Sequence, residues 1–419
     1  MNERGRKRQD FIQNLTIAVL SVTAVLLFAQ TQIYNLGAGF FSEGNKGAPA
    51  PSQTNFTLTA PVRAAVTDGS FGRCGMMALT TADEAFEPLR GLLEQALGSA
   101  RTCVASDGQT FLRALEGTSV YYDFLTPLPL SVLSHLVQTE GEETLSARRL
   151  ILSQQRDTVV LYFSDESGGY LRCETALSSQ ILEEAVNHYE LGNASFAFEL
   201  TDNPAAQTLA PCTLLLNELP TLPELSVSIP LSDTSRLLAS LGFNPNTQNR
   251  YTDASGAEVV TENGRTLRIH PDGTIVYKSG GDPVLSIAAG EEIPTRLEAA
   301  TGVGALLNGL LSSTAGEASL YLESIRQVGG ATALQYGYQV NGVPVHLADG
   351  QGAAQVSLTG RNVSSMTICV RQYASAGTDS LLLPLRQSLS IAARQEGAEL
   401  FIGYTDSGAG TSSAQWLAE

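Results

Sequence analysis

The residue types that carry most enzymatic chemistry are few in this sequence and lie far apart. The only lysines are Lys7, Lys46 and Lys278, and none follows a serine by three positions, so the serine–lysine arrangement of penicillin-binding proteins is absent. The chain also has no G-x-S-x-G motif and no glycine-rich phosphate loop followed by lysine. These absences lower the expectation of an enzyme.

The histidines and acidic residues do not form a recognisable metal or acid–base set. Four histidines fall in four separate predicted elements, without H-E-x-x-H or another short metal-ligand spacing: His135, His188, His270 and His346. Three adjacent glutamate pairs, at 142–143, 183–184 and 291–292, would diverge by about 100° on a helix and are expected to be solvent-exposed. We therefore predict no catalytic residue, no cofactor and no metal site.

Catalytic groups can assemble from distant positions, so one alternative stays open. In this alternative the chain is an extracytoplasmic envelope enzyme or ligand-binding protein whose Asp or Glu side chains gather in a groove. A polar pocket with converging carboxylates or histidines would favour it.

The N-terminal stretch has the features of a membrane anchor. No Asp, Glu, Lys, Arg or His occurs from Phe11 to Ser42, and Phe11 to Ile33 supplies 23 residues where a bilayer needs about 20. The basic cluster at positions 4–8 is expected to stay in the cytoplasm, which places the rest of the chain outside the cell membrane. A cleaved signal peptide is the alternative, but Leu27-Phe28-Ala29 does not fit its small-x-small cleavage rule.

Polar residues inside this segment are candidate membrane-helix contacts, because such side chains help membrane helices to associate. They form two series, Thr16, Thr23 and Gln30, and Asn14 with Ser21. The series are offset by about 200° around a helix and mark opposite faces. Either the helix has two neighbours or these residues are merely tolerated.

The charge of the remaining chain argues against one class of partner. Positions 11–419 hold 21 Lys and Arg against 40 Asp and Glu, a net charge of −19. Such a surface repels phosphate backbones and anionic wall polymers. We therefore expect no nucleic-acid partner.

Helical and alternating patterns are interspersed along the exterior, which predicts an α+β fold with helices packed on antiparallel sheets. A capping box at Thr81 and Glu84 is expected to start one helix, and Pro127 another. Further helices are expected at 233–241 and 294–312, and Pro384 should start or kink the last one.

Turn signals place a meander in the middle of the chain. Ser255-Gly256, Asn263-Gly264 and Asp272-Gly273 separate alternating runs, which predicts one helix on a three-stranded meander. Three prolines in LPTLPELSVSIP (219–230) are expected to interrupt any regular element.

These features divide the chain into five predicted parts. They are a cytoplasmic stub with the anchor (1–35), a flexible linker (36–56), a first α+β domain (57–222), the helix with its meander (223–292) and a C-terminal α+β domain (293–419).

The five cysteines are widely scattered and contain no C-x-x-C pair: Cys74, Cys103, Cys173, Cys212 and Cys369. Their spacing does not predict a disulfide framework, although one bridge in the first domain stays possible. Several lie in apolar runs, where a buried small side chain is expected.

Three stretches carry a resemblance to a known family: YYDFLTPLPLSVLSHLV (121–137), GRTLRIHPDGTIVY (264–277), and LQYGYQVNGVPVHL through ICVRQY (334–373) with IGYTD (402–406) and the terminal Trp416. They resemble the YycH and YycI family of Gram-positive bacteria, which are membrane-anchored regulators of the WalK-type (YycG) sensor histidine kinase. The first two stretches resemble segments of YycH, and the third resembles the YycI C-terminal domain. Those proteins are normally separate chains, whereas this one combines the character of both.

The resemblance implies a PepSY-like fold and a non-enzymatic function. The chain would regulate a two-component sensor histidine kinase that controls cell-wall metabolism, through contacts in the membrane and outside it. The implied partners are the sensor histidine kinase and the lipid bilayer, and a homologous regulator or a second copy of this chain stays open. The resemblance implies no catalytic residue, and it does not give the sign of regulation.

Overall fold

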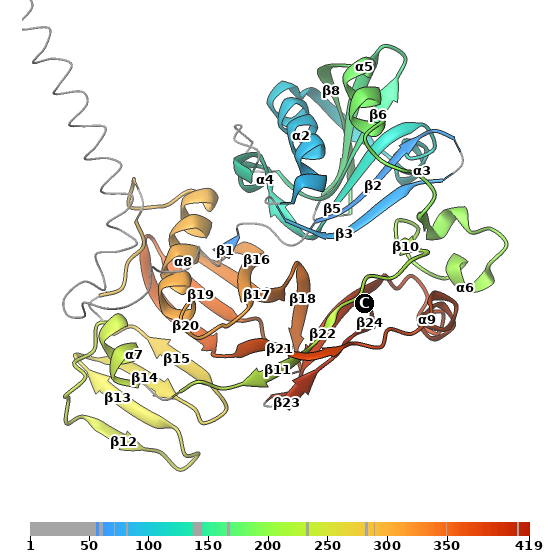
Figure 1. The fold of residues 1–419 in the computed structure, drawn as a ribbon. Coiled ribbons are helices and arrows are strands. Elements are labelled where there is room, and N and C mark those ends of the chain that lie inside the picture. The colour runs from blue at the N-terminus through green and yellow to red at the C-terminus, as the bar shows by residue number, and fades with distance from the viewer. Residues whose placement is uncertain are drawn as a thin grey trace, which may run out of the picture. The chain divides into compact units, whose positions relative to one another are not determined.

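Figure 1 shows the computed structural model, in which helices lie against antiparallel sheets. The structure describes residues 56–57, 62–70, 72–80, 83–136, 145–165, 168–231, 234–280, 284–288, 290–348, 350–408 and 410–419. The fold is α+β, as predicted. Thr54–Glu419 form one compact unit.

The first sheet has seven strands in the order β3-β2-β5-β6-β7-β8-β4, and all neighbours are antiparallel. Its strands are β2 (Val62–Asp68), β3 (Cys74–Leu79), β4 (Arg101–Ser106), β5 (Thr118–Pro129), β6 (Ser146–Gln155), β7 (Thr158–Ser164) and β8 (Tyr170–Ser178). The 3-10 turn η1 (Glu84–Phe86) leads into α2 (Glu87–Ser99), which with α5 (Ser179–Val186) packs on one face of this sheet (Figure 1).

The opposite face of the first sheet is covered by shorter elements. They are α3 (Gly108–Arg113), the two-stranded pair β9 (Ala194–Phe196) and β10 (Leu214–Leu216), and the 3-10 turn η2 (Ala197–Glu199). Phe111, Phe196 and Leu214 join Tyr121 and Ile151 of the sheet in a second apolar core. The short α6 (Pro204–Gln207) follows η2.

Two helix starts differ from the prediction. Thr81 lies outside the described residues, and Glu84 belongs to η1, so α2 itself begins only at Glu87. Pro127 does not start a helix: β5 resumes pairing with β6 at Leu128 after a bulge, and α4 (Leu130–Leu136) follows Pro129 instead. A proline that is the last residue of a strand leaves the next residue free to begin the helix.

One disulfide joins two strands of the first sheet. Cys103 of β4 and Cys173 of β8 are bonded, with Cα atoms 4.1 Å apart. This is the single bridge that the sequence left possible in the predicted first domain. Cys212 and Cys369 are buried, as expected for small apolar side chains.

The second sheet has twelve strands, with the central path β12-β13-β14-β15-β20-β19-β17-β18-β22-β24. Its strands are β1 (Phe56–Thr57), β12 (Arg250–Thr252), β13 (Glu258–Glu262), β14 (Arg265–Ile269), β15 (Thr274–Lys278), β16 (Ala318–Val328), β17 (Ala331–Val340), β18 (Val343–Leu347), β19 (Ala354–Thr359), β20 (Asn362–Cys369), β22 (Leu400–Asp406) and β24 (Ala414–Ala418). Only the pairs β1–β16 and β18–β22 are parallel among these strands.

The predicted meander is present but has four strands, β12 to β15, because the short Arg250–Thr252 also pairs. The three predicted turns are confirmed by left-handed backbone at Gly256, Asn263-Gly264 and Gly273. Helix α7 (Thr234–Ser240) precedes the meander. Strand β15 pairs with β20, so the meander continues the C-terminal sheet.

Helix α8 (Arg296–Leu311) packs on the second sheet. Its capping box is complete, because the Glu298 backbone N–H donates to Thr295 Oγ1 at 3.1 Å and the Thr295 N–H donates to Glu298 at 2.9 Å. The buried Tyr336 hydroxyl donates to the Ala300 carbonyl at 2.7 Å, which fixes the helix to β17.

A third sheet has the order β21-β11-β23, formed by β21 (Gln372–Asp379), β11 (Pro223–Ser228) and β23 (Gly410–Ser412). The expectation that prolines prevent regular structure at 219–230 is therefore wrong. Pro223 is the first residue of β11, where its missing N–H is tolerated. The last helix, α9 (Leu385–Ala392), starts directly after Pro384, as predicted.

Candidate functional site

The predicted membrane contacts lie outside the residues that the structure describes. Asn14, Thr16, Ser21, Thr23 and Gln30 all belong to the undescribed N-terminal part. Within the described ranges, the helices are all too short or too polar to cross a bilayer.

Three charged residues form a row across the first sheet. Arg63 of β2 lies directly opposite Asp123 of β5, which in turn lies opposite Arg149 of β6. Two positions further along these strands, Tyr121 and Ile151 belong to the second apolar core. Because side chains alternate along a strand, the charged row lies on the same face of the sheet as this apolar core.

A distant residue completes this row. Glu399, which precedes β22, accepts a hydrogen bond from Arg63, although 336 positions separate the two residues. The other carboxylate oxygen of Glu399 accepts from Nη2 of Arg148 and of Arg149, each at 2.6 Å. We call Arg63, Asp123, Arg148, Arg149 and Glu399 the ion-pair cluster.

The ion-pair cluster is largely removed from solvent. The side chains of Arg63, Asp123 and Glu399 are 5%, 1% and 9% exposed. Burial alone would raise the pKa of Asp123, but the guanidinium groups of Arg63, Arg148 and Arg149 hold this pKa well below its usual range. The same opposition lowers the pKa of Glu399, so both carboxylates are ionised at neutral pH.

Hydrogen-bond donors exceed acceptors in the cluster. Asp123 Oδ1 accepts from Arg148 Nε at 3.0 Å and from the Leu125 N–H at 2.8 Å, while Oδ2 accepts from Arg63 at 2.5 Å. All four carboxylate oxygens are thus engaged. Among the described residues, however, Arg63 Nε, Arg63 Nη1 and Arg149 Nε have no acceptor. Three guanidinium groups and two carboxylates leave one positive charge in excess.

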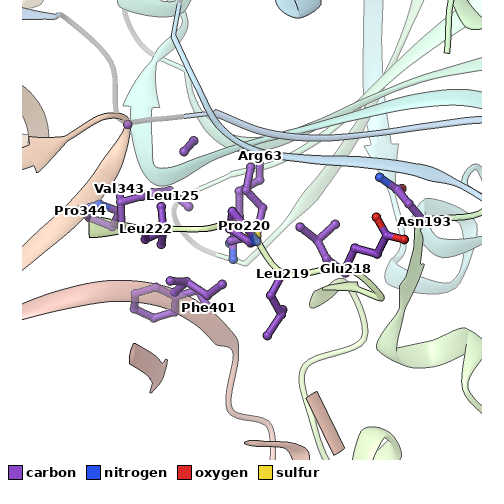
Figure 2. Close-up of a pocket in the computed structure, with 15 residues that line it drawn as sticks. Arg63, Leu125, Asn193, Glu218, Leu219, Pro220, Leu222, Val343, Pro344 and Phe401 are labelled. Atoms are coloured by element: carbon purple, nitrogen blue, oxygen red, sulfur yellow. The ribbon is translucent and has the colours of Figure 1, made fainter. Parts of the chain in front are cut away.

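Two cavities adjoin the cluster. One has a volume of about 320 Å³ and the other about 790 Å³, and both are lined by Arg63, Leu125, Pro344 and Phe401. Figure 2 shows the smaller cavity, where Arg63 lies between Leu125 and Glu218, and Phe401 contributes another wall. Arg63 therefore connects the ion pairs to both cavities.

Backbone strain is concentrated around the smaller cavity. Ala78 and Leu125, which both line it, have φ angles of 58° and 64°, in the left-handed region that residues with a Cβ rarely adopt. Gly342, with φ 75°, lies so close to Ala78 that a Cβ there would be 2.1 Å from the Ala78 carbonyl oxygen. Strained residues persist where the surrounding structure holds them, often at ligand sites.

The larger cavity is lined by acidic groups and a histidine. They are Glu323 of β16, His346 of β18, Glu399 and Glu419. Burial raises the pKa of Glu323, although the Tyr321 hydroxyl and Gln335 Nε2 donate to its carboxylate at 3.2 and 2.7 Å. Burial lowers the pKa of His346, and the Glu419 carboxylate partly offsets this shift.

The remaining predicted groups lie apart from these cavities. His135, His188 and His270 do not line either of them. Glu183, Glu184, Glu291 and Glu292 are exposed, as predicted, whereas the pair at 142–143 is not described. Among the described residues there is no group of three or more His, Cys, Asp or Glu side chains that could hold a metal ion.

No family model, curated protein or solved structure matches this chain. Its function therefore has to be inferred from its own residues. What the site offers chemically is a buried cation with unused N–H donors beside two cavities, which suits the binding of an acceptor or an anion.

Sequence reasoning missed the ion-pair cluster. Its local signals were an aspartate inside the apolar strand YYDF and the Arg148-Arg149 pair that opens an apolar run. Each is unusual in a strand that is otherwise buried. No local signal pairs them with Glu399, because that contact depends on the tertiary fold.

Proposed function

We propose that the chain is a membrane-anchored, non-enzymatic regulator of a two-component sensor histidine kinase that controls cell-wall metabolism. It acts through transmembrane and extracytoplasmic contacts with the kinase. The observation that carries the proposal is helix α8 on the antiparallel strands β16 to β20, because the family resemblance implies such a PepSY-like unit in this part of the chain.

The details of the resembling stretches also support this proposal. GRTLRIHPDGTIVY forms the hairpin of β14 and β15, and LQYGYQVNGVPVHL forms most of β17, its turn and β18. Trp416 lies in β24 beside β22, which carries IGYTD.

An extracytoplasmic location is supported by the Cys103–Cys173 disulfide. Structural disulfides persist mainly outside the reducing cytoplasm. The predicted orientation, with the basic N-terminus inside and the bulk of the chain outside, brings both cysteines into that environment.

Regulation by contact requires that the chain bind one kinase state better than the other. The ion-pair cluster offers a route for coupling, because Glu399 ties the segment before β22 to three arginines on two strands of the first sheet, β2 and β6. A contact that moved either part would strain the same buried ion pairs.

Two genetic changes test the regulatory function. We expect deletion of the gene to change transcription from promoters that the kinase controls, and replacement of residues 11–33 by an unrelated membrane helix to reproduce part of that change. The replacement keeps the basic residues at 4–8, so that the orientation of the chain in the membrane is preserved and only the sequence of the membrane helix changes. Unchanged promoter output after both deletion and swap would contradict the proposal.

A second candidate function is that of an extracytoplasmic enzyme or ligand-binding protein of the envelope. The carboxyl groups of Glu323, Glu399 and Glu419 and the imidazole of His346, all lining the larger cavity, favour it. Incubation of the full chain with isolated cell walls tests it, with soluble fragments and wall-bound protein both measured. Release or binding that Glu323→Gln abolishes would support this candidate. A chain that neither releases fragments nor binds the walls would contradict it.

A further inference from the structure

We propose that the smaller cavity binds a small monoanionic ligand, a carboxylate attached to an apolar body, and that Arg63 receives the carboxylate. The inference goes beyond contact with a kinase, since it assigns a ligand to the exterior part of the chain. It rests on the proposed regulatory function only for the role of that ligand as an input.

The charge of the ion-pair cluster calls for one more anion. The excess of one positive charge is shared by Arg63, which is 4% exposed, and by the partly exposed Arg148 and Arg149, and a buried charge that is not fully paired is costly. A monoanion would neutralise it, whereas Glu218, the carboxylate that also lines this cavity, is exposed to solvent. A dianion such as phosphate would overcompensate beside the ionised Asp123 and Glu399.

The hydrogen-bond pattern leads to the same chemistry. Arg63 uses Nη2 for Asp123 and Glu399, whereas its Nε and Nη1 have no acceptor among the described residues. A carboxylate oxygen is a strong acceptor for a guanidinium N–H. An uncharged ligand could accept such a bond, but it would leave the excess charge in place.

The walls of the cavity define the rest of the ligand. Beside Arg63, most of the lining is apolar, and Figure 2 shows Leu222, Val343, Pro344 and Phe401 grouped on one side of it. At ~30 Å³ for each water-sized group, a volume of about 320 Å³ holds roughly ten non-hydrogen atoms. This favours a short fatty acid or a single blocked apolar amino acid over a long lipid.

The backbone around the cavity is held open before any ligand binds. Ala78 and Leu125 keep left-handed conformations, and the Ala78 carbonyl packs against Gly342 of the β17–β18 turn. A site that is already formed loses less entropy on binding.

Direct binding measurements test the ligand class. The full chain in lipid nanodiscs is titrated with N-acetyl-leucine and with octanoate, and each acid is paired with its amide as an uncharged control of the same shape. We expect at least one acid to bind, and to bind at least tenfold more tightly than its amide. Which acid binds distinguishes an amino-acid source from a fatty-acid source.

Two variants locate the site. Arg63→Gln removes the charge, and Leu219→Trp fills the cavity from a half-buried wall position while leaving every residue of the ion-pair cluster unchanged. We expect each to weaken acid binding at least tenfold. Leu381→Trp is the matched control, because Leu381 is 94% exposed and does not line the cavity.

The proposal is overturned if neither acid binds, if the amides bind as tightly as the acids, or if Leu219→Trp leaves binding unchanged. These results are obtained without a kinase. If no acid binds, promoter output therefore still tests the regulatory function independently. If promoter output does not change, the binding result still stands.

Discussion

Arg63 and Glu399 are joined by a buried hydrogen bond although 336 positions separate them along the chain. Arg63 belongs to the first sheet and Glu399 to the segment that enters β22 of the second. The bond therefore couples the beginning and the end of the described chain. Its partners also line the larger cavity, so stability and binding share the same residues.

Glu399→Gln is expected to destabilise the protein strongly. It removes one of only two carboxylates that serve three guanidinium groups, and breaking a buried ion pair from one side costs about 3–5 kcal/mol. Chemical denaturation of the full chain would measure the free energy of unfolding. Glu396→Gln, at a nearby exposed position, is the control and should change it by less than about 0.5 kcal/mol. Equal stability of the two variants would contradict the role of the ion-pair cluster.

The stability of the protein is expected to fall in acid. The folded-state pKa values of Asp123 and Glu399 are lowered, so the stability they contribute is present above their unfolded-state pKa values of about 3.9 and 4.3. It is lost as the pH falls below about 4 toward the folded-state values. Unfolding curves recorded between pH 7 and pH 3 check this. The decline should be shallower in Glu399→Gln, and an identical decline in both proteins would assign the acid sensitivity to other groups.

Glu323→Gln is expected to have the opposite pH dependence. Burial raises the folded-state pKa of Glu323, so the wild-type protein loses stability as the pH rises from the unfolded-state value of about 4.3 through the folded-state value. Glutamine cannot ionise, and the variant should therefore gain stability relative to wild type as the pH rises. The difference in unfolding free energy between the two proteins, measured from pH 4 to pH 8, tests this. A difference that does not change with pH would show that Glu323 keeps an ordinary pKa.

Reduction of the Cys103–Cys173 disulfide is expected to lower the free energy of unfolding by about 2–5 kcal/mol, because the bond closes a long loop in the unfolded chain. Cys103→Ser should reproduce the effect of a reducing agent on wild type, and the reducing agent should then have no further effect on the variant. Gel mobility without reductant would show the bond directly. A wild-type chain whose mobility and stability do not respond to reductant would contradict it.

The sequence was informative where local chemistry decides the structure. The hairpins at Asn263-Gly264 and Asp272-Gly273 form because Asn263, Gly264 and Gly273 adopt left-handed backbone at little cost, and α8 begins directly after its N-cap Thr295 because the capping box is local. The α+β class follows from the same patterns of turns and periodicity.

The sequence was uninformative where partners come from distant segments. Pro223 starts a strand because β21 and β23 lie on either side of it, and those strands are about 150 and 190 positions away. Glu399 likewise resembles any surface glutamate until its three arginine partners are placed around it. The structure of turn and capping residues could be predicted from their local sequence, whereas the partners of residues that make contacts between sheets could not.

The placement of β11 between β21 and β23 sets a condition on the order in which the chain can fold as it is synthesised. The seven strands between Val62 and Ser178 are made early and can pair among themselves. Strands β1 and β11 must wait, since their partners lie in the last quarter or so of the chain. Arg63 gains its second carboxylate only when the ribosome has nearly finished. A chain that stops before Glu399 would leave Arg63, Arg148 and Arg149 to share Asp123, so the first sheet of an unfinished chain would keep two largely buried positive charges in excess.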